Sequence, residues 1–322
     1  MTNVLGIIPA RGGSKGIPNK NLALLGGRPL LAYTADAVKE SKRLTRTIVT
    51  TDDPRIADCA TSLGLEVPFM RPSSLSGDEV QMLPVLQHAV EALEAEGFNA
   101  DIVVLLQPTS PLRRGEHIDA AVTWLERAGG DSVVSVVEVP HQFNPTSVLR
   151  IDDGLLKPFL EAPTAMRRQD KPRVYARNGP AVVAVKASVL KGGSLYGAQT
   201  WPLGMTPEDS LDIDTLWDLR LVEAVLSARF AAHDAAKSTP YLRIPAKAGF
   251  KHPGTYRVQE GHRMAYSIVA ERDNETVRMR RTSSIIAIAK ARVWASEGWD
   301  VTIIDDDENP LVPAENQRLL TA

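Results

Sequence analysis

Short apolar runs rich in β-branched residues alternate with segments of helical periodicity through the first two-thirds of the chain. This alternation predicts an open, mostly parallel α/β sheet that carries helices on both faces. The expected strands are residues 4–9, 47–51, 66–70, 101–107, 132–139 and 182–185, with a hairpin at 148–156. The expected helices are residues 29–41, 54–63, 80–96, 116–128 and 215–232. Open sheets of this kind bind ligands at the carboxyl ends of their strands.

The pattern changes after residue 232. Residues 233–263 are rich in Lys, Pro and Gly and have no periodicity, which predicts a linker. Residues 264–322 predict a small appended βαβ-like segment, in which a strand, a polar loop, a helix at 283–298 and a second strand follow one another. So short a segment buries only a thin core, so we expect it to dock on another surface or to oligomerise. Its role is not indicated by its sequence.

Composition and charge narrow the function classes. Among 322 residues, 37 are Lys or Arg and 39 are Asp or Glu, giving a net charge of −2. This balance argues against a nucleic-acid partner, although it allows a local basic pocket. A single cysteine, Cys59, excludes an internal disulfide. The apolar run at the start is too short for a signal sequence or a membrane span. We therefore expect a cytoplasmic enzyme with no membrane partner.

A glycine-rich segment follows the first predicted strand directly, at residues 11–16. Glycines at this place let backbone N–H groups approach a phosphate, and the cations Arg11, Lys15 and Lys20 lie close by. The spacing matches neither the P-loop nor the dinucleotide-binding fingerprint. A flexible turn with solvated charges is the alternative interpretation. The combination of strand, glycines and cations favours an anion-binding site.

Two carboxylates, Asp212 and Asp214, precede the last long helix of the main domain. In an extended segment they lie on the same face, with backbones about 7 Å apart. Oxygen ligands of this kind suit Mg²⁺, which needs few protein carboxylates when phosphates supply the rest. The alternative is that Asp214 only caps the helix that begins near Thr215. A phosphate loop elsewhere in the chain favours the metal site.

The third candidate segment, residues 107–113, follows the most apolar predicted strand. Its two prolines stiffen the turn, and the Gln107 amide can both donate and accept hydrogen bonds. A rigid turn with no role is the alternative. Arg71 and Asp78 also follow a strand, where they can contact a nucleotide or lie on the surface.

Three blocks, IIPARGGSKGIPNKN, LLQPTSPLR and DSLDIDT, resemble those of the acylneuraminate cytidylyltransferases, the CMP-sialic acid synthetases. Their order and approximate spacing also match, and the resemblance covers residues 1–232. It implies a single Rossmann-like nucleotidyltransferase domain that forms a homodimer through an inserted arm. The implied reaction transfers CMP from CTP to the anomeric hydroxyl of a sialic-acid-like nonulosonic acid and releases pyrophosphate. The CMP-activated sugar would serve cell-surface glycan synthesis, including lipopolysaccharide.

The glycine loop and the resemblance together assign the site residues. Those expected to bind the nucleotide are Arg11, Gly12, Gly13, Ser14, Lys15, Lys20, Asn21, Arg71 and Asp78. Those expected to bind the sugar acid are Gln107, Arg168, Gln169, Arg177 and Asn178. Asp212 and Asp214 are implied to hold Mg²⁺ and, with Arg11 and Lys20, to promote catalysis. The general base is left open between Asp212 and a hydroxyl whose pKa the metal lowers.

Two departures from the family keep other functions open. Pro180, Ala181 and Val182 stand where the family often has Ala-Ile-Tyr, and Arg177 lies one position before Asn178 rather than two. A 3-deoxy-manno-octulosonate cytidylyltransferase is one alternative. That sister family usually carries proline-glycine-lysine in the first block, where this chain has Ile-Pro-Asn-Lys-Asn. A nucleotide-binding module without catalysis is the other alternative.

Overall fold

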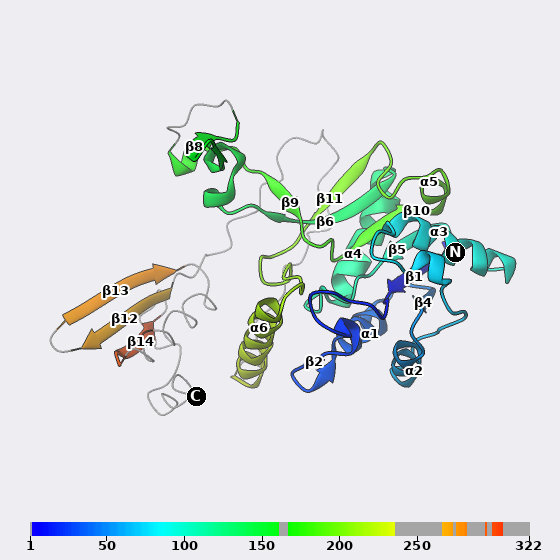
Figure 1. Ribbon diagram of the computed structural model, residues 1–322, viewed down its shortest axis with the longest axis horizontal. Coiled ribbons are helices and arrows are strands. Elements are labelled where there is room, and N and C mark those ends of the chain that lie inside the picture. Colours follow the sequence, from blue (N-terminus) through cyan, green and yellow to red (C-terminus); the bar gives the residue numbers. More distant parts are fainter. Residues whose placement is uncertain are drawn as a thin grey trace. The chain divides into compact units, whose positions relative to one another are not determined.

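The computed structural model describes residues 2–160, 167–235, 266–272, 275–281, 294 and 298–304. The chain divides into two compact units, residues 1–227 and 228–322, each of which has its own sheet (Figure 1). Among the residues that the structure describes, no helix is both long and apolar enough to cross a membrane.

The first unit is built around a seven-stranded mixed sheet with the order β11-β6-β10-β5-β1-β4, and β9 pairs with β6. Its strands are β1 (Val4–Pro9), β4 (Arg46–Thr50), β5 (Ile102–Leu105), β6 (Ser132–Glu138), β9 (Tyr175–Arg177), β10 (Val183–Lys186) and β11 (Thr200–Gly204). Strands β4, β1 and β5 are parallel to one another, and β11 is parallel to β6. Strand β10 runs antiparallel between β5 and β6. The prediction of an open, mostly parallel α/β sheet is confirmed, with one antiparallel strand inside it.

Helices cover both faces of this sheet. They are α1 (Leu30–Glu40), α2 (Pro54–Ser62), α3 (Met82–Ala95), α4 (Gly115–Ala128) and α5 (Ala187–Lys191). A further helix, α6 (Leu216–Ala235), follows β11. One apolar cluster joins α1, α2 and α4 to the sheet, and a second joins α3 and α5 to it. In β1 the side chains alternate between these clusters, Ile8 facing the first and Ile7 the second. Because both faces are covered, every residue of β1 is buried, which explains its continuous apolar run.

Most predicted elements of this unit are present, and helix α2 shows why. Asp53 caps α2 by accepting a hydrogen bond from the Arg55 N–H, and Pro54 occupies its first turn. Gly64, with a φ of 76°, lies just beyond its end.

The strand predicted at 66–70 is reduced to two isolated bridges, at Glu66 and Met70. Strands β9 and β11 and helix α5 were not predicted. Short antiparallel pairs occur at β2 (Leu24–Leu25) and β3 (Arg28–Pro29).

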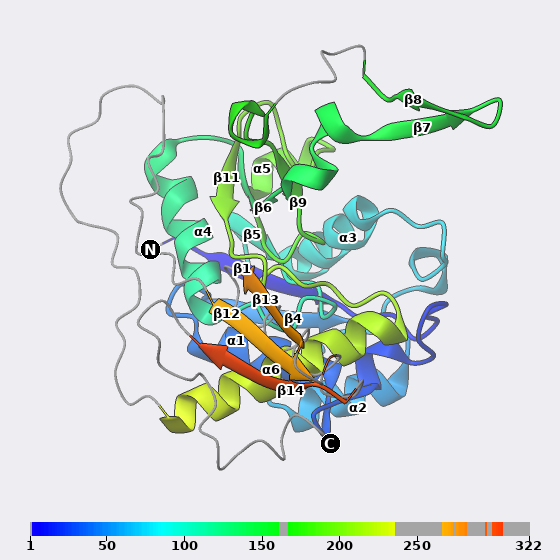
Figure 2. The ribbon, with the colours of Figure 1, turned by 90° about the vertical axis from the view of Figure 1, so that its left-hand side faces the viewer.

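Residues 139–174 connect β6 to β9, and we call them the arm. The arm carries a hairpin of β7 (Leu149–Asp152) and β8 (Leu155–Pro158), which extends away from the sheet (Figure 2). At its turn, Asp153 and Gly154 both have a positive φ, as a two-residue hairpin loop requires. The predicted hairpin is confirmed.

The second unit contains a three-stranded antiparallel sheet of β12 (Tyr266–Arg272), β13 (Glu275–Arg281) and β14 (Asp300–Ile304). Strands were predicted at the positions of β12 and β14, but the polar loop predicted after β12 is wrong, because β13 lies there. The antiparallel pairing of β12 with β14 differs from the parallel pairing of a βαβ unit. Almost all of the predicted linker and of the helix at 283–298 lies outside the described residues.

Candidate functional site

A pocket of about 450 Å³ lies at the carboxyl ends of β1 and β5. It is lined by residues from segments far apart in the sequence: the glycine loop, the turn after β5 and the acidic segment before α6. Eight of the predicted site residues line it together: Arg11, Ser14, Lys15, Lys20, Asn21, Arg71, Gln107 and Asp214. The structure therefore joins the three sequence blocks in one cavity.

The glycine loop is held by carboxylates that follow β4. The Gly12 N–H donates to Asp52 Oδ1 over 3.1 Å, and Arg71 Nη2 lies 3.5 Å from the same oxygen. A Cβ at Gly12 would lie 2.7 Å from Asp53 Oδ2, so a larger residue would displace the cap of α2. At the other end of the loop, Asn21 Nδ2 donates to the carbonyl oxygen of Arg11 over 2.9 Å. These bonds fix the shape of the predicted phosphate loop.

Positive charge gathers at this end of the pocket. Burial lowers the pKa of Arg71, whose side chain is 3% exposed, and the nearby charge of Arg11 lowers it further. Arg11 and Lys15 both form ion pairs with Asp78. Hydrogen bonds from Lys15 and Arg11 hold the pKa of the Asp78 carboxyl below its usual value. An anion bound here would relieve the repulsion between the two arginines.

The acidic segment lies directly against the glycine loop. Lys20 Nζ donates to the carbonyl oxygen of Ile213 over 2.9 Å and to Asp214 Oδ1 over 3.0 Å. Gly16 lies so close that a Cβ there would be 2.3 Å from the carbonyl oxygen of Asp214. Glycine is therefore needed at position 16 to let two distant parts of the chain meet.

Asp212 lies deeper than Asp214, on the side of the turn after β5. Its Oδ1 accepts a hydrogen bond from Ser110 Oγ over 3.1 Å. Gly179, with a φ of 102°, packs so closely that a Cβ would lie 3.0 Å from the same oxygen. Burial raises the pKa of Asp212, and the charge of Asp214 raises it further, whereas hydrogen bonds from Thr109 and Ser110 lower it.

This pair of carboxylates fits a magnesium ion. Asp212 is costly to ionise because it is buried beside a second negative charge, and a divalent cation would remove that cost. Among the residues that the structure describes, no group of three or more His, Cys, Asp or Glu side chains could hold a metal. Two carboxylates alone match an ion that takes its remaining ligands from phosphates and water.

The residues predicted to bind the sugar acid are spread over four places, of which the second pocket that Arg177 lines is described below. Gln107 lines the pocket described above. Asn178 is buried, and its amide is bonded to protein groups: Oδ1 accepts from Ser135 Oγ over 2.6 Å, and Nδ2 donates to Ser210 Oγ over 2.8 Å. Arg168 and Gln169 lie on an exposed 3₁₀ turn of the arm. Of these, only Gln107 shares the cavity with the glycine loop.

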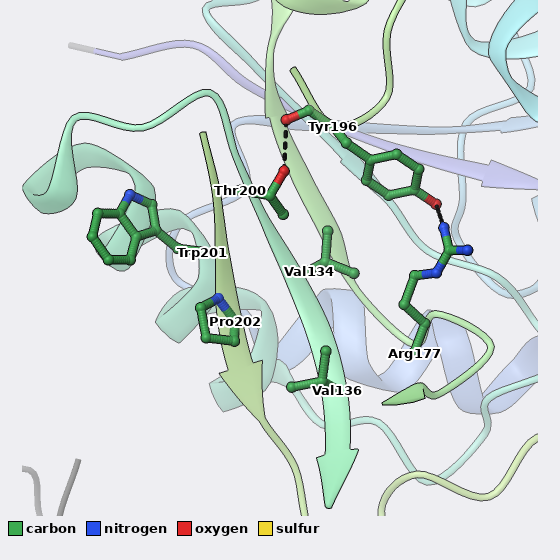
Figure 3. Close-up of a pocket in the computed structure, with 7 residues that line it drawn as sticks. All are labelled: Val134, Val136, Arg177, Tyr196, Thr200, Trp201 and Pro202. Atoms are coloured by element: carbon green, nitrogen blue, oxygen red, sulfur yellow. Dashed lines mark hydrogen bonds between the residues drawn. The ribbon is translucent and has the colours of Figure 1, made fainter. Parts of the chain in front are cut away.

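Arg177 lines a second pocket of about 310 Å³ on strands β6 and β11 (Figure 3). Apolar side chains line most of it, among them Val134, Val136 and Trp201. Arg177 Nη1 donates to the Tyr196 hydroxyl over 2.7 Å, and the guanidinium lies 5.2 Å from the centre of that ring. Arg177 therefore does not line the cavity of the glycine loop, and its predicted contact with the sugar would require the sugar to reach this second pocket.

Two residues that form hydrogen bonds to the segments of the site were not predicted, Asp52 and Arg113. Asp52 follows a strand at the ligand-binding edge, which is a signal that the sequence offers. Arg113 belongs to a quoted block, but only the structure shows that its guanidinium is buried and bonded to the turn after β5.

Comparisons with known proteins give the family to which the chain belongs. Residues 5–189 match the family model described as "Cytidylyltransferase". The chain is 35% identical over 226 residues to CMP-N,N'-diacetyllegionaminic acid synthase of Legionella pneumophila, covering 69% of this chain and 96% of that protein. It is 33% identical over 222 residues to N-acylneuraminate cytidylyltransferase of Escherichia coli, covering 68% of this chain and about half (51%) of that protein.

The fold is also that of solved cytidylyltransferases. A structure of CMP:2-keto-3-deoxy-manno-octonic acid synthetase with CTP superposes with a TM-score of 0.55 at 17% identity, covering 71% of this chain and all of that one. At this identity the likeness concerns the fold. With the family match over more than half of its length, the chain belongs to the cytidylyltransferase family.

Proposed function

We propose that this protein transfers CMP from CTP to the anomeric hydroxyl of a nonulosonic acid and releases pyrophosphate. Two relatives named above support this proposal, because one is a CMP-N,N'-diacetyllegionaminic acid synthase and the other an N-acylneuraminate cytidylyltransferase. The observation that carries the proposal is that one pocket holds groups of all three kinds. In it, Lys20 bonds to Asp214, and Arg11, Arg71 and Gln107 line the same cavity. It combines cations for a triphosphate, the Asp214 carboxylate for a metal and an amide for a sugar.

The nucleotide would enter at the cationic end. Its phosphates would displace Asp78 from Arg11 and Lys15 and would neutralise the charge of Arg71. Bonds to Asp52 and from Asn21 fix the backbone of the glycine loop at the same end. The Gly12 N–H is used in the first of them, so a backbone N–H bond to the phosphates would come from other residues of the loop. This arrangement holds the triphosphate in one orientation before the second substrate binds, which lowers the entropic cost of the reaction.

In the reaction, the sugar hydroxyl oxygen forms a bond to the α-phosphorus while the bond between that phosphorus and the bridging oxygen breaks and pyrophosphate leaves. The hydroxyl proton passes to Asp212 or to water. Three electron-rich groups must come together: the hydroxyl, the sugar carboxylate and the triphosphate. Arg11, Lys15 and Lys20 reduce the repulsion between them. A magnesium ion held by Asp212 and Asp214 would supply further positive charge to the phosphates. Gln107, at the end of β5, would orient the sugar acid.

The test is pyrophosphate release from CTP and Mg²⁺ with N-acetylneuraminate, N,N'-diacetyllegionaminate and 3-deoxy-manno-octulosonate offered separately. Release with a nine-carbon acid supports the proposal and names the substrate. Release with the octulosonate alone would move the protein to that sister activity. CTP binding without release from any acid would contradict the proposed reaction. We place the reaction in the cytoplasm, where CTP is made.

We also propose that the protein is a homodimer formed through the arm. The arm exposes large apolar side chains, among them Phe143, Ile151, Leu155, Leu156 and Phe159. Monomeric proteins rarely expose contiguous apolar patches of this kind, and such patches mark interaction sites. Light scattering of the purified protein tests this, since a mass of one chain, 35.0 kDa, would contradict a dimer.

A further inference from the structure

Arg113 is a buried cation beside the site that the mechanism above does not use. It ends the turn after β5, where its N–H bonds to the carbonyl oxygen of Ser110, and it is only 2% exposed. Burial lowers the pKa of its guanidinium to about 9, and the charge of Asp212 opposes this decrease. The group is therefore still charged at neutral pH.

Burying this charge is costly, because none of the ion pairs among the described residues includes Arg113. A residue that only filled the core could be apolar and would avoid this cost. The guanidinium instead makes three hydrogen bonds to neutral oxygens, which points to a geometric role.

The three hydrogen bonds join three segments of the chain. Nη1 donates to the carbonyl oxygens of Gln107 and Ala181, each over 2.9 Å. Nη2 donates to Thr34 Oγ1 on α1 over 2.7 Å. Gln107 lines the substrate pocket, and Ala181 belongs to the turn in which Gly179 touches Asp212. A planar guanidinium can reach these diverging acceptors at once, and a lysine ammonium cannot keep the same geometry.

We propose that Arg113 is a positioning residue for CMP transfer: it holds Gln107 and the turn at residues 178–181 in register around Asp212. This inference rests on the proposed function. The inference predicts different effects on the two ends of the pocket, because the hydrogen bonds of the Arg113 side chain go to Gln107, Ala181 and Thr34 and not to the cationic end. Loss of Arg113 therefore affects the placement of the sugar acid and of the metal-binding carboxylate more than it affects CTP binding.

The experiment compares Arg113→Ala, Arg113→Lys and wild type by pyrophosphate release and by calorimetric titration with CTP. For Arg113→Ala we expect kcat to fall by about 10²-fold, as a misplacement of about 1 Å produces, with CTP affinity kept within a few-fold. Added guanidinium, far below denaturing concentrations, should restore part of kcat by filling the space between the three acceptors. Arg113→Lys should retain only part of the activity.

Arg46→Ala is the matched control. Arg46 is the first residue of the edge strand β4, at the end of the strands opposite to the pocket, and it pairs with Glu66 and Glu96. We expect it to lower thermal stability while leaving kcat and the response to guanidinium unchanged.

Three outcomes would overturn the inference. The first is a folded Arg113→Ala protein with wild-type kcat. The second is a decrease in kcat that is fully explained by a smaller fraction of protein able to bind CTP. If Arg113→Ala does not fold, full kcat in folded Arg113→Lys refutes the geometric role. An inactive wild type would refute the proposed function as well, whereas an active wild type with active variants refutes this inference alone.

Discussion

Replacing Gly16 with alanine tests whether the contact between the glycine loop and the acidic segment is essential. The new Cβ would lie 2.3 Å from the carbonyl oxygen of Asp214, while ordinary contact begins at 3.4 Å. The two backbones would have to separate by about 1 Å, and a misplacement of that size costs about 10²-fold in rate. Gly16 does not have a positive φ, so the backbone of the new residue is not itself strained. The cost of overpacking is about 1–3 kcal/mol of unfolding free energy.

The assay is pyrophosphate release at saturating CTP and sugar acid, together with thermal unfolding of the same samples. We expect kcat to fall by about 10²-fold while the protein stays folded. Gly204→Ala is the control, because a Cβ at Gly204 would meet no atom within 4 Å and the residue lies on β11. Wild-type kcat in Gly16→Ala would refute the argument that the two segments must touch for catalysis.

Four further predictions concern other parts of the first unit. Asp212→Asn should abolish turnover yet keep or raise the melting temperature, because burial makes the ionised carboxylate unfavourable; normal turnover would remove its metal role. Since burial raises the pKa of Asp212 in the metal-free protein, Mg²⁺ affinity should begin to fall on acidification above the usual Asp range, which calorimetric Mg²⁺ titrations at several pH values measure. Asn178→Ala should cost about 2–3 kcal/mol in denaturant unfolding, since Ser135 and Ser210 lose their partner. Ile151→Lys with Leu156→Lys should give a monomer in light scattering, whereas an intact dimer would exclude the arm as the interface.

Local signals were enough for the elements that determine the site. The apolar run of β1, the capping Asp53 of α2 and the turn at Asp153 and Gly154 each specify their structure within a few residues. The blocks that follow β1 and β5 were predicted to share an edge of the sheet, and the structure places both in one pocket. Their roles toward CTP and the sugar remain predictions.

The missed elements lack such local signals. Pro202 within β11 argues against a strand, but β11 lies at the edge of the sheet, where proline is tolerated. In β13, Val277 and Met279 alternate with arginines, and the high charge of the segment obscured this period of two. The bonds of Arg113 to Gln107 and Ala181 depend on long-range packing, so no pattern within one segment could indicate them.

The bond between Lys20 and Asp214 spans 194 positions of the chain. During synthesis, the loop near the start of the protein must wait until nearly the whole first unit has left the ribosome before its acidic partner is available. A nascent or truncated chain that ends before residue 214 contains every strand of the main sheet, yet it lacks the Asp214 carboxylate that completes the pocket. Under the proposed function, such incomplete copies would not consume CTP.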